Sequence, residues 1–181
     1  MTRGAARRIA RAMRPVSATA SIDVPRERLF DVLVDLAVRP SFMDHLVSDY
    51  RLERIESRGV GAAARFRLRE SGGWMDTQIE AAERPRLVRE QGRGGRLNRV
   101  PVFTVWELAE GPSPQSTELT VTFWTEPQHP ADRVRELFGS SRHFAAGWRK
   151  SLHRLRDLIE SGEPLEPVGV AGGDRLPALV H

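Results

Sequence analysis

The sequence predicts an α+β domain built from an antiparallel sheet and one long C-terminal helix. Between residues 47 and 125, segments of alternating apolar and polar residues are separated by short turns, which is typical of an antiparallel meander. Between residues 130 and 161 the apolar residues instead recur every three or four positions, as on one face of a helix. The 181 residues are enough for one domain with a packed core.

The domain is expected to begin with a strand and a helix. In Val16–Val24 the apolar residues occupy every even position, which indicates a half-buried strand. A helix over residues 25–37 should follow, because Pro25 suits a first helical position and the apolar residues after it form one stripe. Pro40 should end this helix or break it, since a proline disfavours helix in the residue before it.

Six more strands are expected after this break, at residues 47–58, 62–70, 74–83, 86–91, 100–110 and 117–125. The alternation assigns each residue of a strand to one face or the other. Asp76, Glu80 and Glu107 share their strands with apolar neighbours of the opposite parity, so these three carboxylates should point outward. The pattern does not settle which face of the strand at 86–91 is buried.

The last helix carries a continuous apolar stripe, so it should lie against an equally long partner. The stripe consists of Val134, Leu137, Phe138, Phe144, Ala145, Trp148, Leu152, Leu155 and Ile159. Gly139, followed by two serines, predicts a kink or a break inside this helix.

Both ends of the chain differ in composition from the middle. Residues 1–15 contain five arginines and no acidic residue, and are expected to form a flexible basic arm. Residues 162–181 contain seven glycines or prolines and are expected to be a mostly disordered tail. The folded domain should therefore span residues 16–161.

Composition excludes several classes of function. The high isoelectric point of about 10.7 comes from the arm, because residues 16–181 hold 23 basic and 24 acidic residues. Nucleic acid is therefore not an expected partner. The chain has no cysteine, which excludes disulfides and thiolate chemistry. No apolar run is long enough to span a membrane, and the amino end has no signal-peptide core, so we expect a cytoplasmic protein.

No cofactor or metal site is expected either. The segment beginning at Gly59 matches a dinucleotide fingerprint, G-x-G-x-x-A, but a strand pattern follows it where that motif needs a helix. A β-turn is the better interpretation. No two histidines have the three- or four-residue spacing of helical metal ligands.

The predicted order of elements resembles the SRPBCC superfamily, which has the helix-grip fold of START, Bet v 1-like and polyketide cyclase/dehydrase-like proteins. "ASIDVPRERLFDVLVD" is similar to its first strand and proline-led helix, and "GVGAAARFRL" to its G-x-G-T turn and strand, with Ala62 in place of the usual threonine. "ERPRLV" and "FTVWELAE" resemble later strands. "VRPSFMDHL" stands where many members have a tryptophan-containing segment.

The resemblance implies a curved sheet of about seven strands wrapped around the C-terminal helix, with two short helices after the first strand. It also implies an apolar cavity between the sheet and that helix. Phe42 and Met43, just after the break at Pro40, would then lie at the end of the sheet. They either plug the core there or gate the mouth of the cavity.

The candidate ligand-binding residues are the inward-facing aromatic and apolar side chains together with a few hydroxyl groups that orient a ligand. They are Phe30, Leu33, Phe42, Met43, Tyr50, Phe66, Met75, Thr77, Thr104, Trp106, Phe123, Ser141, Phe144 and Trp148. No catalytic residue is identified, because a hydroxyl needs an activating partner and none is visible.

The sequence thus predicts the binding of a hydrophobic or aromatic small molecule, or of a lipid, without a cofactor. One alternative, implied by the resemblance alone, is a polyketide cyclase or aromatase; a buried His, Asp or Glu touching the cavity would favour it. Another is a membrane- or protein-associated module that carries a lipid or quinone, with weak membrane contact through the basic arm.

Overall fold

The computed structural model describes residues 15–113, 115–127 and 140–170. Its strands are β1 (Val16–Ile22), β2 (Val47–Leu52), β3 (Ala63–Leu68), β4 (Trp74–Glu83), β5 (Leu87–Gly94), β6 (Val100–Glu110) and β7 (Thr117–Thr125). Its helices are α1 (Arg26–Leu33), η1 (Leu36–Val38), α2 (Pro40–Met43), η2 (Arg96–Asn98) and α4 (Ser140–Ser161).

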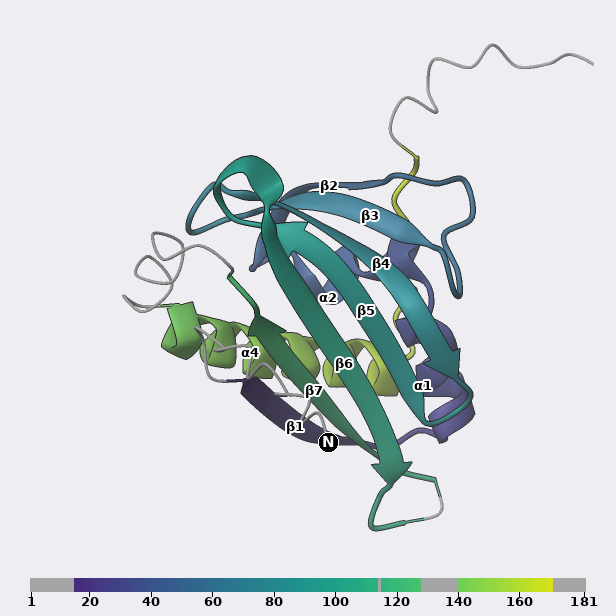
Figure 1. The fold of residues 1–181 in the computed structure, drawn as a ribbon. Coiled ribbons are helices and arrows are strands. Elements are labelled where there is room, and N and C mark those ends of the chain that lie inside the picture. Colours follow the sequence, from purple (N-terminus) through teal and green to yellow (C-terminus); the bar gives the residue numbers. More distant parts are fainter. Residues whose placement is uncertain (1–14, 114, 128–139, 171–181) are drawn as a thin grey trace, which may run out of the picture.

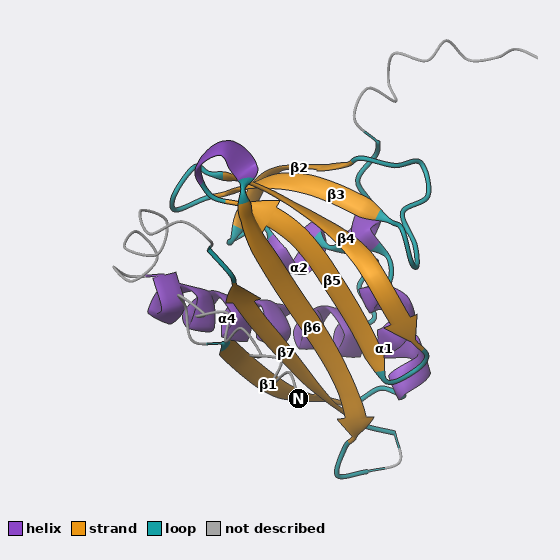
Figure 2. Cartoon of the chain, viewed as in Figure 1, coloured by secondary structure: helices purple, strands orange, loops and turns teal. Residues whose placement is uncertain are grey.

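The seven strands form one antiparallel sheet in the order β1-β7-β6-β5-β4-β3-β2. The sheet curls, and α4 lies along its concave side. Helices α1 and α2 lie on the same side of the sheet (Figure 1; Figure 2). This arrangement confirms the predicted α+β helix-grip fold. Strands β1 and β2 follow one another in the chain but occupy opposite edges of the sheet, so the segment with α1, η1 and α2 bridges the open side.

The core lies between the concave face and α4. Along β7 every second residue is buried, and Leu119, Val121 and Phe123 face the helix, as the alternation predicts. Trp148 and Leu152 contribute to this core from α4, whose buried residues recur at helical spacing. Gly147 lies on the same helix, and a Cβ there would come within 2.3 Å of the side chain of Leu46, so this glycine lets the chain after α2 approach α4 closely.

The first helix is shorter than predicted. It ends at Leu33, not near Pro40, and Pro40 instead begins α2. The cause is Asp35: its Oδ1 accepts hydrogen bonds from the backbone N–H of Ala37 and from the hydroxyl of Ser57, both at 3.0 Å. This carboxylate therefore caps a new turn, η1, and holds it against the segment after β2. Proline at the first position of α2 lacks only an N–H that would be free in any case.

Three expected regions lie partly outside the described residues. Residues 1–14 of the basic arm do so, as do residues 171–181 of the tail and residues 128–139, where the start and the kink of the last helix were expected. Residues 162–170 of the tail differ from the expected disorder. Val168 donates a backbone hydrogen bond to Ala37, and Val170 forms a β-bridge with Leu52 of β2.

Candidate functional site

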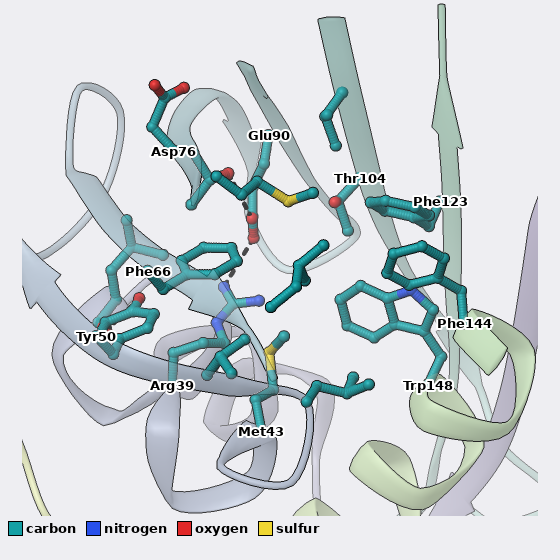
Figure 3. Close-up of a pocket in the computed structure, with 17 residues that line it drawn as sticks. Arg39, Met43, Tyr50, Phe66, Asp76, Glu90, Thr104, Phe123, Phe144 and Trp148 are labelled. Carbon is teal, nitrogen blue, oxygen red and sulfur yellow. Dashed lines mark hydrogen bonds and ion pairs between the residues drawn. The ribbon is translucent and has the colours of Figure 1, made fainter. Parts of the chain in front are cut away.

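A cavity lies between α4, the concave face of the sheet and the short helices (Figure 3). Its lining consists of Leu36, Arg39, Met43, Leu46, Val47, Tyr50, Phe66, Leu68, Met75, Asp76, Thr77, Glu90, Val102, Thr104, Phe123, Phe144 and Trp148. The cavity has a volume of about 40 Å³. The cavity is therefore narrow, and an organic ligand would enter as side chains move apart.

Aromatic rings form two walls of the cavity. Phe123 of β7 packs against Phe144 and Trp148 of α4, with ring centroids 4.8 and 5.8 Å apart. On the other wall Tyr50 stacks on Phe66 at 5.6 Å (Figure 3). Offset aromatic contacts of this kind are favourable beyond the area they bury. The two walls present flat apolar surfaces to whatever lies between them.

Two methionines also line the cavity. Met43 of α2 and Met75 of β4 both contribute to the lining and are almost fully buried. A methionine side chain is unbranched and has three rotatable bonds, so it adapts to gaps of irregular shape. These two residues are the part of the lining best suited to yield to a ligand.

A buried ion pair stands at one side of this apolar space. Nη2 of Arg39 lies 2.8 Å from Oε1 of Glu90, and the two residues are only 3% and 4% exposed. Arg39 comes from the end of η1 and Glu90 from the middle of β5, 51 positions later in the chain. The curl of the sheet and the break after α1 bring them together, and Figure 3 shows the contact between their side chains.

The carboxylate of Glu90 accepts hydrogen bonds on both oxygens. Oε1 accepts from Arg39 and from the indole nitrogen of Trp106, each at 2.8 Å, and Oε2 accepts from the hydroxyl of Thr77 at 3.1 Å. Hydrogen bonds from several donors stabilise a buried negative charge. Glu90 is thereby fixed in orientation, with Thr77 on the cavity side.

The guanidinium of Arg39 is equally constrained. Its Nη2 also donates to the backbone carbonyl of Leu33 at 2.7 Å. Its central carbon lies 4.7 Å from the ring centroid of Trp106 and 5.8 Å from that of Phe42, within the range of cation–π attraction. Nε is buried and has no hydrogen-bond partner among the described residues.

Tyr50 supplies a phenol to the opposite wall. Its hydroxyl donates to the backbone carbonyl of Leu36 at 2.9 Å. Burial raises the pKa of this phenol well above its ordinary value, because the apolar surroundings disfavour the phenolate. Tyr50 therefore stays protonated, and its single donor is engaged by the carbonyl of Leu36.

Nine of the fourteen candidate residues lie on the cavity wall: Met43, Tyr50, Phe66, Met75, Thr77, Thr104, Phe123, Phe144 and Trp148. Phe30, Leu33, Phe42 and Trp106 are instead buried in the core outside the lining. Phe42 thus plugs the end of the core, while its neighbour Met43 borders the cavity. The side chain of Ser141 lies outside the described part of the structure. That the nine residues contact a ligand stays a prediction.

Sequence reasoning missed the ion pair. Arg39 was interpreted only as the residue before a helix-breaking proline, and Glu90 lies on the strand whose facing was unsettled. A signal for Glu90 does exist: Arg89, Gln91 and Arg93 are exposed on alternate positions, which places Glu90 on the buried side with Val88. Asp76 contributes to the lining, but its carboxylate points away from the cavity in Figure 3 and accepts from the side chain of Asn98, as the expected outward direction requires.

The described residues hold no group of three His, Asp or Glu side chains that could bind a metal ion. Among the same residues, no helix is both long enough and apolar enough to cross a membrane.

Several solved structures share this fold. Protein DR_A0006 from Deinococcus radiodurans matches with a TM-score of 0.57 and 18% identity, over 82% of this chain and 99% of that one. TTHA0849 from Thermus thermophilus matches with a TM-score of 0.60 and 15% identity, over 83% and 100%. DynU16, a putative protein in the dynemicin biosynthetic locus, matches with a TM-score of 0.55 and 18% identity, over 86% of this chain and 50% of DynU16. At such identities the likeness shows the fold alone.

The sequence itself gives the family. No curated protein matches the chain. A family model described as polyketide cyclase / dehydrase and lipid transport matches residues 13–160, which include every described strand and nearly all of α4. Together with the curled seven-stranded sheet around a C-terminal helix, this match agrees with the SRPBCC resemblance noted from the sequence. The chain therefore belongs to the polyketide cyclase/dehydrase and lipid transport family of the SRPBCC superfamily.

Proposed function

We propose that this domain binds a hydrophobic or aromatic small molecule, or a lipid, in the cavity between the sheet and α4. The observation that carries the proposal is an apolar, aromatic-walled cavity with a few fixed polar groups, Arg39, Glu90 and Thr77, on one side. That combination is typical of small-molecule sites, in which apolar surface gives affinity and a few polar groups give orientation.

The buried ion pair supports binding over a purely structural core. Removing two charges from water opposes folding, and apolar residues of similar volume often stabilise a core better. The Arg39–Glu90 pair is thus not expected to increase the stability of the fold over an apolar pair. It can, however, hold a polar group of a ligand. The narrowness of the cavity does not prevent ligand binding, because the side chains of Met43 and Met75 can move aside.

The proposal is tested with a fluorescent apolar probe, N-phenyl-1-naphthylamine, whose emission rises on transfer from water to an apolar site. We expect saturable binding by the wild-type protein and at least a tenfold weaker affinity for Val102→Phe, which fills the cavity from β6. Val60→Phe is the matched control, since Val60 lies on the surface. Equal affinity in all three proteins, at unchanged melting temperatures, would place the probe elsewhere and contradict the proposal.

A second candidate, an enzyme of the cyclase type, is favoured by one observation: Glu90 is a buried carboxylate that borders the cavity. Glu90 would remove a proton from the carbon next to a ligand carbonyl, and Arg39 would donate a hydrogen bond to the oxygen of the resulting enolate. The enolate carbon would then attack a second carbonyl of the same chain, which closes a ring, and the alkoxide formed from that carbonyl would take the proton back from Glu90.

This candidate is tested without knowing the substrate. The protein is mixed with an aryl methyl ketone in heavy water, and the loss of the methyl proton signal is followed by NMR. Exchange faster than in buffer, abolished in Glu90→Gln but not in Glu107→Gln, would support the enzyme. Glu107 is an exposed glutamate on β6 and serves as the matched control. Exchange at the buffer rate in every protein would leave binding as the function.

A further inference from the structure

The polar groups at the cavity offer more hydrogen-bond donors than acceptors. A guanidinium has five N–H donors. The hydrogen bonds of Arg39 to described residues all leave from Nη2, to Glu90 and to the carbonyl of Leu33, and its Nε is buried with no acceptor among them. The indole nitrogen of Trp148, a residue only 4% exposed, likewise has no acceptor within the described residues.

The carboxylate oxygens of Glu90, by contrast, are occupied. Oε1 of Glu90 already receives two donors, and Oε2 receives the hydroxyl of Thr77. An unsatisfied buried donor is unfavourable, so a ligand that brings an acceptor to Arg39 gains more than one that brings a second donor.

The charges of the Arg39–Glu90 pair favour a ligand whose acceptor is neutral. Arg39 and Glu90 form a pair whose formal charges cancel, and the carboxylate of Glu90 lies beside the very guanidinium that a ligand would approach. A ligand carboxylate would therefore meet a like charge in a buried setting, where charges are weakly screened. A carbonyl oxygen takes the same hydrogen bonds without that repulsion.

The guanidinium of Arg39 is also pre-organised to bind such an acceptor. The Leu33 carbonyl, the Glu90 carboxylate and the ring of Trp106 fix its position and its plane before any ligand arrives. A donor that is already ordered loses little entropy when it binds an acceptor.

We propose that the cavity selects apolar molecules that carry a neutral carbonyl oxygen, such as an aryl ketone or a quinone, and that Arg39 is the residue that recognises this oxygen. The inference rests on the proposed binding function and names the class of ligand for the same site. Arg39 acts here as a specificity-determining residue, whereas the aromatic walls and the methionines accept the apolar body of the ligand.

The test compares three probes that share one ring system: 2-acetylnaphthalene, 2-ethylnaphthalene and 2-naphthoate. Each is measured by displacement of N-phenyl-1-naphthylamine. We expect the ketone to bind roughly ten- to a hundredfold more tightly than the hydrocarbon, as for a hydrogen bond to a charged group, and more tightly than the carboxylate.

Arg39→Lys should reduce the preference for the ketone to less than about threefold. Lysine keeps the positive charge beside Glu90 but lacks the planar set of N–H donors. Arg67→Lys, the same change at an exposed site, is the matched control and should leave the preference unchanged. The double variant Arg39→Met/Glu90→Met removes both charges, so it should bind the two neutral probes equally well.

The wild-type comparison decides the matter even if a variant fails to fold. Equal affinity for 2-acetylnaphthalene and 2-ethylnaphthalene overturns this inference and leaves the proposed binding function standing. Tighter binding of 2-naphthoate than of the ketone overturns it as well. Absence of binding by N-phenyl-1-naphthylamine and all three probes contradicts the proposed function and this inference together.

Discussion

At the scale of single residues, His45 links the short helices to α4. One ring nitrogen, Nε2, lies 3.1 Å from the backbone carbonyl of Gly147. The other, Nδ1, is buried without a hydrogen-bond partner among the described residues and lies 3.8 Å from Oδ1 of Asp44. Burial lowers the pKa of His45 below its ordinary value of 6.5. Lys150 and Arg154 act in the same direction, and the Gly147 carbonyl and Asp44 oppose them. The folded protein thus favours the neutral ring, with Nε2–H donating to Gly147.

This lowered pKa predicts a pH dependence of stability. The unfolded chain binds a proton on His45 at a higher pH than the folded chain does, so the contribution is complete above about pH 6.5 and is lost as the pH falls toward the lower folded pKa. His45→Gln should flatten the decrease in melting temperature between pH 7 and pH 5. His153→Gln, at an exposed position on α4, should not. Parallel curves for wild type and His45→Gln would contradict the assignment.

Trp148 lies where the cavity meets the core. Its ring is T-shaped to Trp106 at 5.4 Å and also touches Phe123. We expect Trp148→Ala to lower the free energy of unfolding by about 3–5 kcal/mol in urea titrations, as for other buried aromatic residues. Trp74→Ala is the control: Trp74 is half-buried beside Arg51, Arg65 and Arg67, and its loss should have a smaller effect. Similar losses for both would mean that Trp148 adds no more to packing than a surface tryptophan does.

The sequence predicted the aromatic part of the site better than the polar part. Alternation along β4, β6 and β7 directs Met75, Thr104 and Phe123 inward, because a strand has a fixed two-residue period. Arg39 and Glu90 face each other only through the curl of the sheet and the break after α1. No local pattern encodes a contact between residues 51 positions apart.

At the scale of elements, β4 and β5 approach each other closely at Gly92. A Cβ on Gly92 would lie 1.9 Å from the backbone oxygen of Asp76, and backbone cannot rotate out of the way as a side chain can. Gly92→Ala should therefore lower the free energy of unfolding by about 2 kcal/mol or more. Gln91→Ala, at the exposed neighbouring position, should change it by less than about 0.5 kcal/mol. Denaturant titrations compare the two, and equal values would show that the strands separate easily there.

The predicted elements agree with the structure where turns and alternation act together. The bounds of β4, β6 and β7 match the predicted ranges, and each of these strands has turn residues at its ends. The prediction was wrong between residues 34 and 37, which were expected to continue the first helix. There the capping of η1 by Asp35 depends on Ser57, which is distant in the sequence, and so it outweighs a helical pattern that continues locally.

At the scale of the whole molecule, residues 162–170 cross from the end of α4 to the edge strand β2. The hydroxyl of Ser41 donates to the carbonyl of Glu166 at 3.3 Å, and Val168 and Val170 pack against the core. A chain truncated after Gly162 should melt several degrees below one truncated after Val170, because only the second keeps these contacts. Differential scanning calorimetry compares them, and equal midpoints would show that this segment adds nothing to stability.

The order of strands has a further consequence, for the time course of folding. Residue Val16 pairs with Phe123, and among the strands that the structure describes β1 pairs only with β7. During synthesis β1 therefore emerges first but has nothing to pair with until about a hundred more residues have been added. Contacts so distant in the chain slow folding, because a long loop must close before they form. Of the strands in this sheet, the first to be synthesised is therefore among the last to pair.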